Sequence, residues 1–388
     1  YTADTVAPVL EGFSLDLTAE TLTLSFSETV DTGSFNASEL VLQSSRSGAP
    51  AQALRLAASS STTSSANGPV VVVDLGLSDL NELKRLDQLA VDAGSTWLSI
   101  GSAAVWDTAA VANAVASIAP AAALSVTVYT ADTVRPRLTG FALDLTAETL
   151  ALTFDETVDT AALNTSGLEL QSTGDRSEPY TYRLTGGTTA SADGTVVVVD
   201  LSAADLNAIK RMRELAVDAG TSFLAAEPSA MADMAGNALV AVTGTAALST
   251  AAYTADTTAP RLVAFDLSLD GAGRLVLTFD ETMDASTFTP TQLRLQDAAT
   301  ATTVRVLTGG LFDANRTGDS TVITLTLAKA DLDAIKQDTG LAVSTSTTWL
   351  SFGAALAADM AGNSVVAQPD GNATRVATLT ADQTAPTL

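Results

Sequence analysis

Pairs of acidic side chains recur at three places in the chain, each time at the end of a hydrophobic stretch. The pattern is Glu-Thr-x-Asp, and it occupies 28–31, 156–159 and 281–284. A second pattern, Asp-Met-Ala-Gly-Asn, occurs at 233–237 and 359–363. Carboxylate and amide oxygens in flexible loops are the ligands that Ca²⁺ prefers in proteins. These residues are therefore candidates for calcium binding.

Other site chemistry is limited by the composition. The 388 residues include no cysteine and no histidine, so thiolate nucleophiles, disulfides, imidazole bases and the usual zinc ligands are excluded. Paired carboxylates can hydrolyse glycosides, but they recur three times here and aromatic residues make up only 5% of the chain. We expect no enzyme. With 44 acidic and 19 basic residues the net charge is −25, so we expect no nucleic-acid partner.

The acidic patterns belong to a long repeat. Tyr-Thr-Ala-Asp-Thr occurs at Tyr1, Tyr129 and Tyr253, and a variant with Asp382 follows near the end. The interval of about 126 residues is far longer than the ~20 to 50 residues of a solenoid repeat, so each repeat is a whole domain. The predicted domains are 1–128, 129–252 and 253–378, with 379–388 opening a fourth repeat.

Within each repeat, apolar residues alternate with Ser and Thr, as at Leu22, Leu24 and Phe26, which is typical of a half-buried strand. Many short strands separated by turn residues predict an all-β fold of tandem Ig-like antiparallel β-sandwich domains. No apolar run reaches the ~18 residues of a membrane helix, so we expect no membrane insertion in this segment. The other predicted strands start near Leu40, Val70 and Thr96, near Leu168, Val196 and Ser222, and near Leu293, Val322 and Thr348.

One short helix is predicted between strands of each repeat, at 78–84, 202–210 and 328–336. In the second, Ser202 and Asp205 have the spacing of a capping box. Each helix carries a lysine near its C-terminus: Lys84, Lys210 or Lys336. We interpret these lysines as part of a solvated helix face. The alternative is a contact with an acidic neighbour.

Successive sandwich strands run in opposite directions, so their loops alternate between the two ends of a domain. This counting places the linker aspartate, the Glu-Thr-x-Asp loop and the Asp-Met-Ala-Gly-Asn loop at one end. Adjacent carboxylates without a basic residue nearby repel one another, which favours a calcium ion there. The predicted ligands are Asp132, Glu156, Asp159, Asp233 and Asn237 in the second repeat, and Asp256, Glu281, Asp284, Asp359 and Asn363 in the third.

An alternative without metal stays open for the same residues. Asp and Asn can bond local backbone N–H groups, Gly can supply a positive φ, and Glu28, Glu156 and Glu281 can cap loop amides. The first repeat has only Asp107 to Asn113 at this place, without the glycine, so we expect it to bind calcium worst.

The motifs Leu-x-Leu-Thr-Phe-Asp-Glu-Thr-Val-Asp, Asp-Met-Ala-Gly-Asn and Asp-Thr-Thr-Ala-Pro resemble bacterial Ig-like repeats of S-layer proteins, large adhesins and cyanobacterial motility-associated cell-surface proteins. The resemblance extends along the whole chain, except that the loop motif is not matched at 107–113. It implies secretion, rod-like arrays and calcium-stiffened linkers, with Asp132, Asp256, Asp233, Asp359 and the Glu/Asp loops as the matching positions.

We therefore expect a structural segment of a long extracellular surface or filament protein, such as a spacer, a fibre or an appendage component. The alternative is an adhesin or a glycan-binding surface module. The expected partners are neighbouring repeats of the same chain, further copies through self-association, or other surface proteins. Sequons indicate candidate N-glycosylation at Asn36, Asn164, Asn315 and Asn372.

Overall fold

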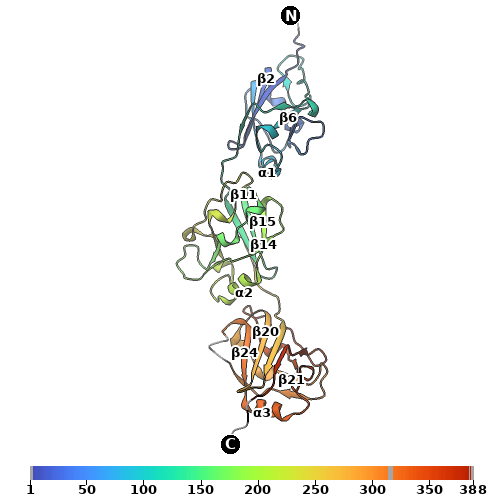
Figure 1. Cartoon of the computed structure of the whole chain (residues 1–388). Helices are drawn as coiled ribbons and strands as arrows, with labels where there is room; N and C mark the ends of the chain where they lie inside the picture. The colour runs from blue at the N-terminus through green and yellow to red at the C-terminus, as the bar shows by residue number, and fades with distance from the viewer. Residues whose placement is uncertain (1–2, 313–317, 384, 386–388) are drawn as a thin grey trace.

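Three similar units follow one another along an elongated chain, with the N-terminus at one end and the C-terminus at the other (Figure 1). The computed structural model describes residues 3–312, 318–383 and 385. Each unit has its own hydrophobic core, drawn from 10–115, 138–239 and 262–376. Among the described residues, no helix has the length and apolar character needed to span a membrane.

The first unit is a sandwich of two sheets. Strand order in the larger sheet is β5-β2-β1-β9, with β7 also paired to β2, and in the smaller sheet it is β4-β3-β6-β8. The strands are β1 (Leu10–Asp16), β2 (Thr21–Asp31), β3 (Leu40–Gln43), β4 (Ala53–Arg55), β5 (Gly68–Asp74), β6 (Trp97–Ile100), β7 (Trp106–Asp107), β8 (Leu124–Ser125) and β9 (Val128–Thr130).

The second and third units repeat this plan, with sheets β14-β15-β11-β10-β18 and β13-β12-β16-β17, then β23-β24-β20-β19-β27 and β22-β21-β25-β26. The second unit has β10 (Leu138–Asp144), β11 (Thr149–Val158), β12 (Leu168–Gln171), β13 (Thr181–Arg183), β14 (Thr188–Thr189), β15 (Gly194–Asp200), β16 (Phe223–Ala226), β17 (Leu248–Ser249) and β18 (Ala252–Thr254). The third has β19 (Leu262–Ser268), β20 (Arg274–Met283), β21 (Arg294–Gln296), β22 (Val304–Val306), β23 (Gly310–Phe312), β24 (Ser320–Leu327), β25 (Trp349–Ser351), β26 (Thr374–Arg375) and β27 (Thr378–Thr380).

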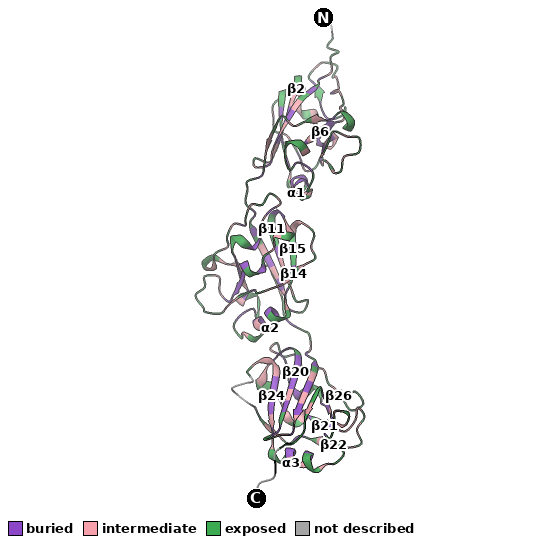
Figure 2. Cartoon of the chain, viewed as in Figure 1, coloured by how far each residue is buried: buried purple, intermediate pink, exposed green. Residues whose placement is uncertain are grey.

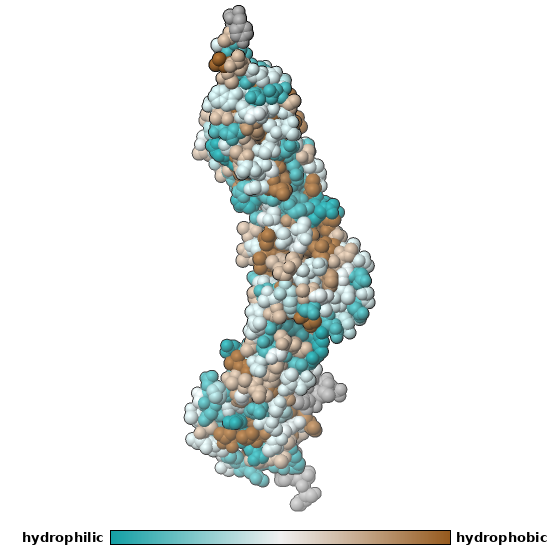
Figure 3. All heavy atoms as spheres, turned by 180° about the vertical axis from the view of Figure 1, so that it is seen from behind, coloured by the Kyte–Doolittle hydropathy of each residue, from teal (hydrophilic) through white to brown (hydrophobic). Residues whose placement is uncertain are grey.

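Alternation along each strand builds the cores. In β2 the apolar Leu22, Leu24 and Phe26 are buried while the intervening Ser and Thr are not, because successive side chains of a strand point to opposite faces. Figure 2 shows the same banding along β20 and β24. The prediction of all-β Ig-like sandwiches is confirmed. On the outside, apolar side chains occur in small groups among polar ones (Figure 3).

The last strand of each unit is its only parallel one among the described strand pairs. β9 pairs in parallel with β1, β18 with β10 and β27 with β19. Each of these strands lies across a predicted domain division, at 128/129, 252/253 and 378/379. The linker aspartate therefore follows directly after a strand that belongs to the preceding unit.

The helices are α1 (Leu77–Arg85), α2 (Ala203–Arg211) and α3 (Lys329–Gln337). Each lies at the C-terminal end of its unit, and α1 and α2 face the unit that follows (Figure 1). Ser202 caps α2, since its hydroxyl oxygen accepts the Asp205 N–H at 3.1 Å. In a capping box the Asp205 carboxylate would also accept the Ser202 N–H, and this part of the prediction is wrong. The carboxylate accepts hydrogen bonds from Thr185 and Tyr182 instead.

Candidate functional site at the joints between units

Three acidic groups lie at the N-terminal ends of the three units. In each group one carboxylate oxygen per residue lies within 4.8 Å of the others. Each combines a linker aspartate, the glutamate at the end of the second long strand and the aspartate of a later loop. The groups are Asp4, Glu28 and Asp107, then Asp132, Glu156 and Asp233, then Asp256, Glu281 and Asp359.

Strand register brings the loop aspartate to the glutamate. Two residues after Glu28, Glu156 and Glu281, the chain forms an antiparallel bridge to the loop: Val30 with Asp107, Val158 with Asp233 and Met283 with Asp359. The bridge fixes the aspartate across from the glutamate, and the linker passes over both. Loops more than 70 residues apart in sequence therefore meet at one point.

At the first joint, a lysine of the preceding unit lies between these carboxylates. Lys84, near the end of α1, places its Nζ 2.8 Å from Asp132 Oδ2 and 2.6 Å from Glu156 Oε2. Only 4% of the Lys84 side chain is exposed, and the carboxylates are comparably buried. These three charged groups are buried together. They bind the helix of one unit to the linker and to the sheet of the next unit.

An asparagine one turn earlier on the same helix adds hydrogen bonds between uncharged groups. Asn81 Oδ1 accepts the Thr157 N–H at 3.0 Å, and the Asn81 carbonyl accepts the Thr157 hydroxyl at 2.9 Å. Residues three apart on a helix share a face, so Asn81 and Lys84 present one surface to the neighbour. The contact surface is therefore an Asn-x-x-Lys helix end against a Glu-Thr strand end.

The second joint repeats this arrangement and extends it. Lys210 Nζ lies 2.7 Å from Asp256 Oδ2 and 2.8 Å from Glu281 Oε2, and Asn207 accepts the Thr282 hydroxyl. In addition, the half-exposed Arg213 contacts Asp284 at 3.0 Å and Asp319 at 2.8 Å. The first joint has Asp87 at the position of Arg213, and that carboxylate accepts a hydrogen bond from Gln52 of its own unit.

Beyond the third unit only part of the arrangement is present among the described residues. Lys336 Nζ lies 2.8 Å from Asp382 Oδ2, with 25% of the lysine side chain exposed. Asp333 takes the position of Asn81 and Asn207, and it pairs with Lys329 at 2.6 Å.

These contacts correct two sequence-based interpretations. Lys84 and Lys210 do not lie on a solvated helix face; the alternative, a contact with an acidic neighbour, is what the structure contains. The expectation that no basic residue lies near the carboxylates is also wrong. The solvated face was the favoured interpretation because these lysines come from the preceding repeat, more than 40 residues before the linker. Their recurrence at equal spacing ahead of Asp132, Asp256 and Asp382 was the available signal.

The aspartate–asparagine loops are held by hydrogen bonds of their own. Asp233 Oδ1 accepts the N–H groups of Ala235 and Asn237, and Asp233 Oδ2 accepts Asn237 Nδ2 at 2.8 Å. Asn237 Nδ2 also donates to the Asp132 carbonyl at 3.1 Å, which fastens the linker. Asp359, Asn363 and the Asp256 carbonyl make the same contacts in the third unit, and Gly236 and Gly362 have positive φ.

The loop of the first unit forms the same contacts despite its different sequence. Asn113 N–H donates to Asp107 Oδ1 at 2.9 Å and Asn113 Nδ2 to Asp107 Oδ2 at 2.7 Å. The sequence motif is not matched at 107–113, yet the structure keeps its hydrogen bonds there. Two extra residues lengthen the turn, which removes the need for glycine, while the bridge to Val30 keeps Asp107 in place.

Two further predicted ligands lie at the edge of these groups. Asp159 Oδ1 accepts the Ala161 N–H at the start of the 3₁₀ helix Thr160–Ala162, and Asp284 caps Ala285–Thr287 in the same way. Burial favours the neutral form of Asp284, but hydrogen bonds from Arg213 and Ser286 outweigh it and lower its pKa. These aspartates therefore organise the loop beside the joint.

Burial also sets the protonation of the glutamates. Loss of water raises the pKa of Glu156 to about 7, although the hydrogen bond from Lys84 acts in the opposite direction. Asp132 and Asp233 raise it further by repulsion. Glu281 is in the same situation beside Lys210, with its pKa also raised to about 7. Burial lowers the pKa of each lysine, but the hydrogen bonds that the ammonium donates to the two carboxylates outweigh it, so the pKa is raised.

The donor set at the inner joints does not fit a calcium ion while the lysine is present. Ca²⁺ takes six to eight oxygen ligands. In the second unit both oxygens of Asp233 already accept protein hydrogen bonds, and one oxygen each of Asp132 and Glu156 faces Lys84. A calcium ion has to displace the ammonium, so calcium stays a prediction for these residues.

Three of the four candidate glycosylation sites fall among the described residues. Asn164 and Asn372 are exposed and Asn36 is half-buried. The Oδ1 atoms of Asn36 and Asn164 each accept the N–H group of the residue two positions later, which starts a short 3₁₀ helix. Asn315 lies outside the described residues.

Comparisons with known proteins give structural matches only. No protein-family model matches the chain, and no curated protein is significantly similar in sequence. FdeC, an Escherichia coli adhesin, matches at TM-score 0.23 and 14% identity over 97% of this chain and all of that one. The FN1–FN3 domains of chicken CNTN1 match at TM-score 0.25 and 8% identity over 92% and 94%. Domains 1–6 of the surface layer protein SbsC match at TM-score 0.19 and 10% identity, over 98% of this chain and 55% of that one. Likenesses this weak say nothing about function.

The raised pKa of Glu156 predicts a defined pH dependence. A carboxyl that binds its proton more tightly in the folded chain contributes stability below its unfolded pKa of 4.5, and loses it as the pH rises through about 7. We expect the free energy of unfolding of the unaltered chain, relative to Glu156→Gln, to fall by about 1 to 3 kcal/mol across this window. Urea unfolding at a series of fixed pH values measures this free energy of unfolding. The Glu281→Gln variant should show the same pH dependence. If the difference in unfolding free energy between the two proteins does not change with pH, the raised pKa of Glu156 is contradicted.

Competition between lysine and calcium is the second prediction. Lys84→Gln and Lys210→Gln remove the ammonium while leaving the carboxylates in place. We expect Ca²⁺ to bind the double variant at least about tenfold more tightly than the unaltered chain, because it no longer displaces a positive charge. Calorimetric titration after chelation measures the affinity. Lys329→Gln on the exposed side of α3 is the matched control, and equal affinity in all three proteins contradicts competition.

Proposed function

We propose that this chain is a structural segment of an extracellular surface or filament protein, in which each unit is fixed to the next by a buried lysine. The observation that carries the proposal is the recurrence of one joint: Lys84 with Asp132 and Glu156, and Lys210 with Asp256 and Glu281. In both cases the ammonium joins a helix, a linker and the neighbouring sheet, three elements whose relative motion would otherwise bend the array.

The energetics of buried charge make the joint depend on all three partners being in contact at once. Separating the units leaves a lysine and two carboxylates to be rehydrated individually, but removing only one partner leaves uncompensated charge in a buried place. Such single removals cost about 3 to 5 kcal/mol. The joint therefore favours one relative orientation of adjacent units over a range of orientations, which is the property of a stiff spacer.

The charge distribution agrees with this role. The acidic groups most suited to chemistry are engaged by lysine at both inner joints, which supports structure rather than catalysis. The net charge of −25 disfavours lateral contact between bare copies, so reach along the chain axis is the property that the repeats provide.

Stiffness is the testable consequence. In the Lys84→Gln, Lys210→Gln variant we expect a broader distribution of angles between units in electron micrographs and a shorter average length by small-angle X-ray scattering. The Thr157 amide, which donates to Asn81 across the joint, should exchange its hydrogen at least about tenfold faster. Lys329→Gln is the control that alters the same charge away from the joints. Unchanged angles and exchange rates contradict a joint held by lysine.

Adhesion is the second candidate, favoured by a recurring set of exposed valines. Val70 and Val72 on β5, and Val196 and Val198 on β15, are 37% to 49% exposed on the outer sheet face. Apolar side chains displayed at equivalent places in two units give a surface for another molecule.

A binding experiment separates adhesion from a pure spacer. We expect an adhesive chain to retain ligands on a glycan array and to lose them when Val196 and Val198 are changed to serine, while the scattering profile stays the same. Absence of any bound glycan favours the spacer.

A further inference from the structure

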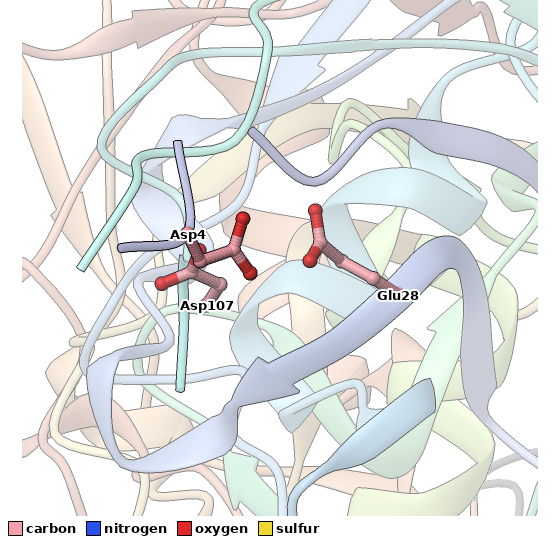
Figure 4. Close-up of side chains that lie close together, drawn as sticks. All are labelled: Asp4, Glu28 and Asp107. Carbon is pink, nitrogen blue, oxygen red and sulfur yellow. The ribbon is translucent and has the colours of Figure 1, made fainter. Parts of the chain in front are cut away.

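The N-terminal face of the first unit has the same construction as the two inner joints, yet no described lysine lies on it. Asp4, Glu28 and Asp107 occupy the places of Asp132, Glu156 and Asp233. Figure 4 shows the carboxylate of Glu28 directed towards those of Asp4 and Asp107. We refer to these three residues together with Thr29 as the first-unit face.

Two independent observations indicate a missing cationic partner. The equivalent groups of the second and third units each hold an ammonium within 2.8 Å of two carboxylates. In the first-unit face, Glu28 Oε1 is shielded from water and has no hydrogen-bond partner. Loss of water, followed by repulsion from Asp4 and Asp107, raises the pKa of Glu28, as expected for a carboxylate without a counter-ion.

Exposure of the surrounding residues indicates the size of the missing partner. Thr157 and Thr282 are 1% and 2% exposed because Asn81 and Asn207 cover them, whereas Thr29 is exposed. Glu156 and Glu281 are each 7% exposed, but Glu28 is only half-buried. A free metal ion or a single amine cannot cover the threonine as well as the glutamate. The partner that covers both at the inner joints is a helix end with Asn and Lys three residues apart.

An apolar contact beside the cluster agrees with this. Met234 and Met360, in the loops after Asp233 and Asp359, line hollows of about 360 and 270 Å³ formed with the preceding unit. In the first unit the corresponding loop carries Val111, which is 73% exposed. The first-unit face, with Val111 beside it, therefore presents an acidic group, a threonine and an apolar side chain in the arrangement that is covered at the inner joints.

We propose that the first-unit face receives the Asn-x-x-Lys helix end of another unit of this type, placed ahead of Asp4 in the same polypeptide. The bridging aspartate favours one polypeptide over two. At both inner joints the lysine pairs with a linker aspartate that connects the two units it joins. Lys336 of a second copy already has Asp382 beside it, so Asp4 and Asp382 would compete for one ammonium.

The sequence offers a direct experiment, because 1–6 and 129–134 are both Tyr-Thr-Ala-Asp-Thr-Val. A duplicate of 1–128 placed before Tyr1 of the full chain therefore reproduces the sequence around the first joint. A zero-length carbodiimide reagent joins a lysine to a carboxylate only where the two touch. We expect mass spectrometry to find Lys84 of the added unit joined to Glu28, in a yield similar to that between Lys84 and Glu156.

Amide hydrogen exchange gives a second readout. The Thr29 amide should exchange at least about tenfold more slowly in the extended chain than in the 388-residue chain, as expected if the added Asn81 accepts its N–H. The control carries Lys84→Gln in the added unit alone, which removes the crosslink and keeps the inner joints intact.

Several outcomes overturn the proposal. One is an unlinked Glu28 in molecules whose Lys84 and Glu156 are joined. A second is calcium binding at Glu28 that persists in the extended chain. A third, seen by mixing isotopically heavy and light 388-residue chains, is a link from Lys336 of one copy to Glu28 of another, which contradicts a partner in the same polypeptide. Failure of the inner crosslinks would instead count against the proposed stiff spacer.

Discussion

One constraint organises the array: a buried ammonium must be matched by carboxylates from more than one structural element. Lys84 and Lys210 are too deeply buried to be solvated, so each depends on a linker aspartate and a strand-end glutamate of the next unit. Because the aspartate lies directly after the last strand of the lysine's own unit, the linker is held at the same point where the two units touch. Orientation and connection are fixed by the same three side chains.

The two inner joints share this constraint and differ in what surrounds it. Arg213 adds exposed ion pairs to Asp284 and Asp319 at the second joint, while Asp87 at the same position of the first joint turns back to its own unit. Exposed pairs contribute little individually, about 0 to 1 kcal/mol, so Arg213 changes the stability of the second joint only slightly. The arginine contacts two separate segments of the third unit, at Asp284 and at Asp319.

Sequence patterns predicted much of this architecture because the responsible forces are local. Alternation at Leu22, Leu24 and Phe26 indicated the strands, and leucine spacing with Ser202 located the helix to within a residue or two. Counting strand directions brought the linker aspartate, Glu156 and Asp233 to one end of a unit. The lysine partner of these carboxylates was predicted only as an alternative, because Lys84 looks like any lysine at a helix C-terminus until the neighbouring unit is placed against it. Likewise, the glycine of the motif is absent at 107–113, but the strand bridge from Val30 to Asp107 preserves the loop's hydrogen bonds over a longer turn.

The parallel pairing of first and last strands has a mechanical meaning. The chain enters the first unit just before β1 and leaves it just after β9, and these neighbouring strands point the same way along the axis. A pulling force on the two ends therefore slides β1 and β9 past each other. The contacts from Thr127 N–H to the Phe13 carbonyl and from Leu17 N–H to the Thr130 carbonyl share that force and have to break together rather than in succession. The same strand order in the second and third units gives every unit along the chain this shear geometry, which resists extension better than strands that peel apart one bond at a time.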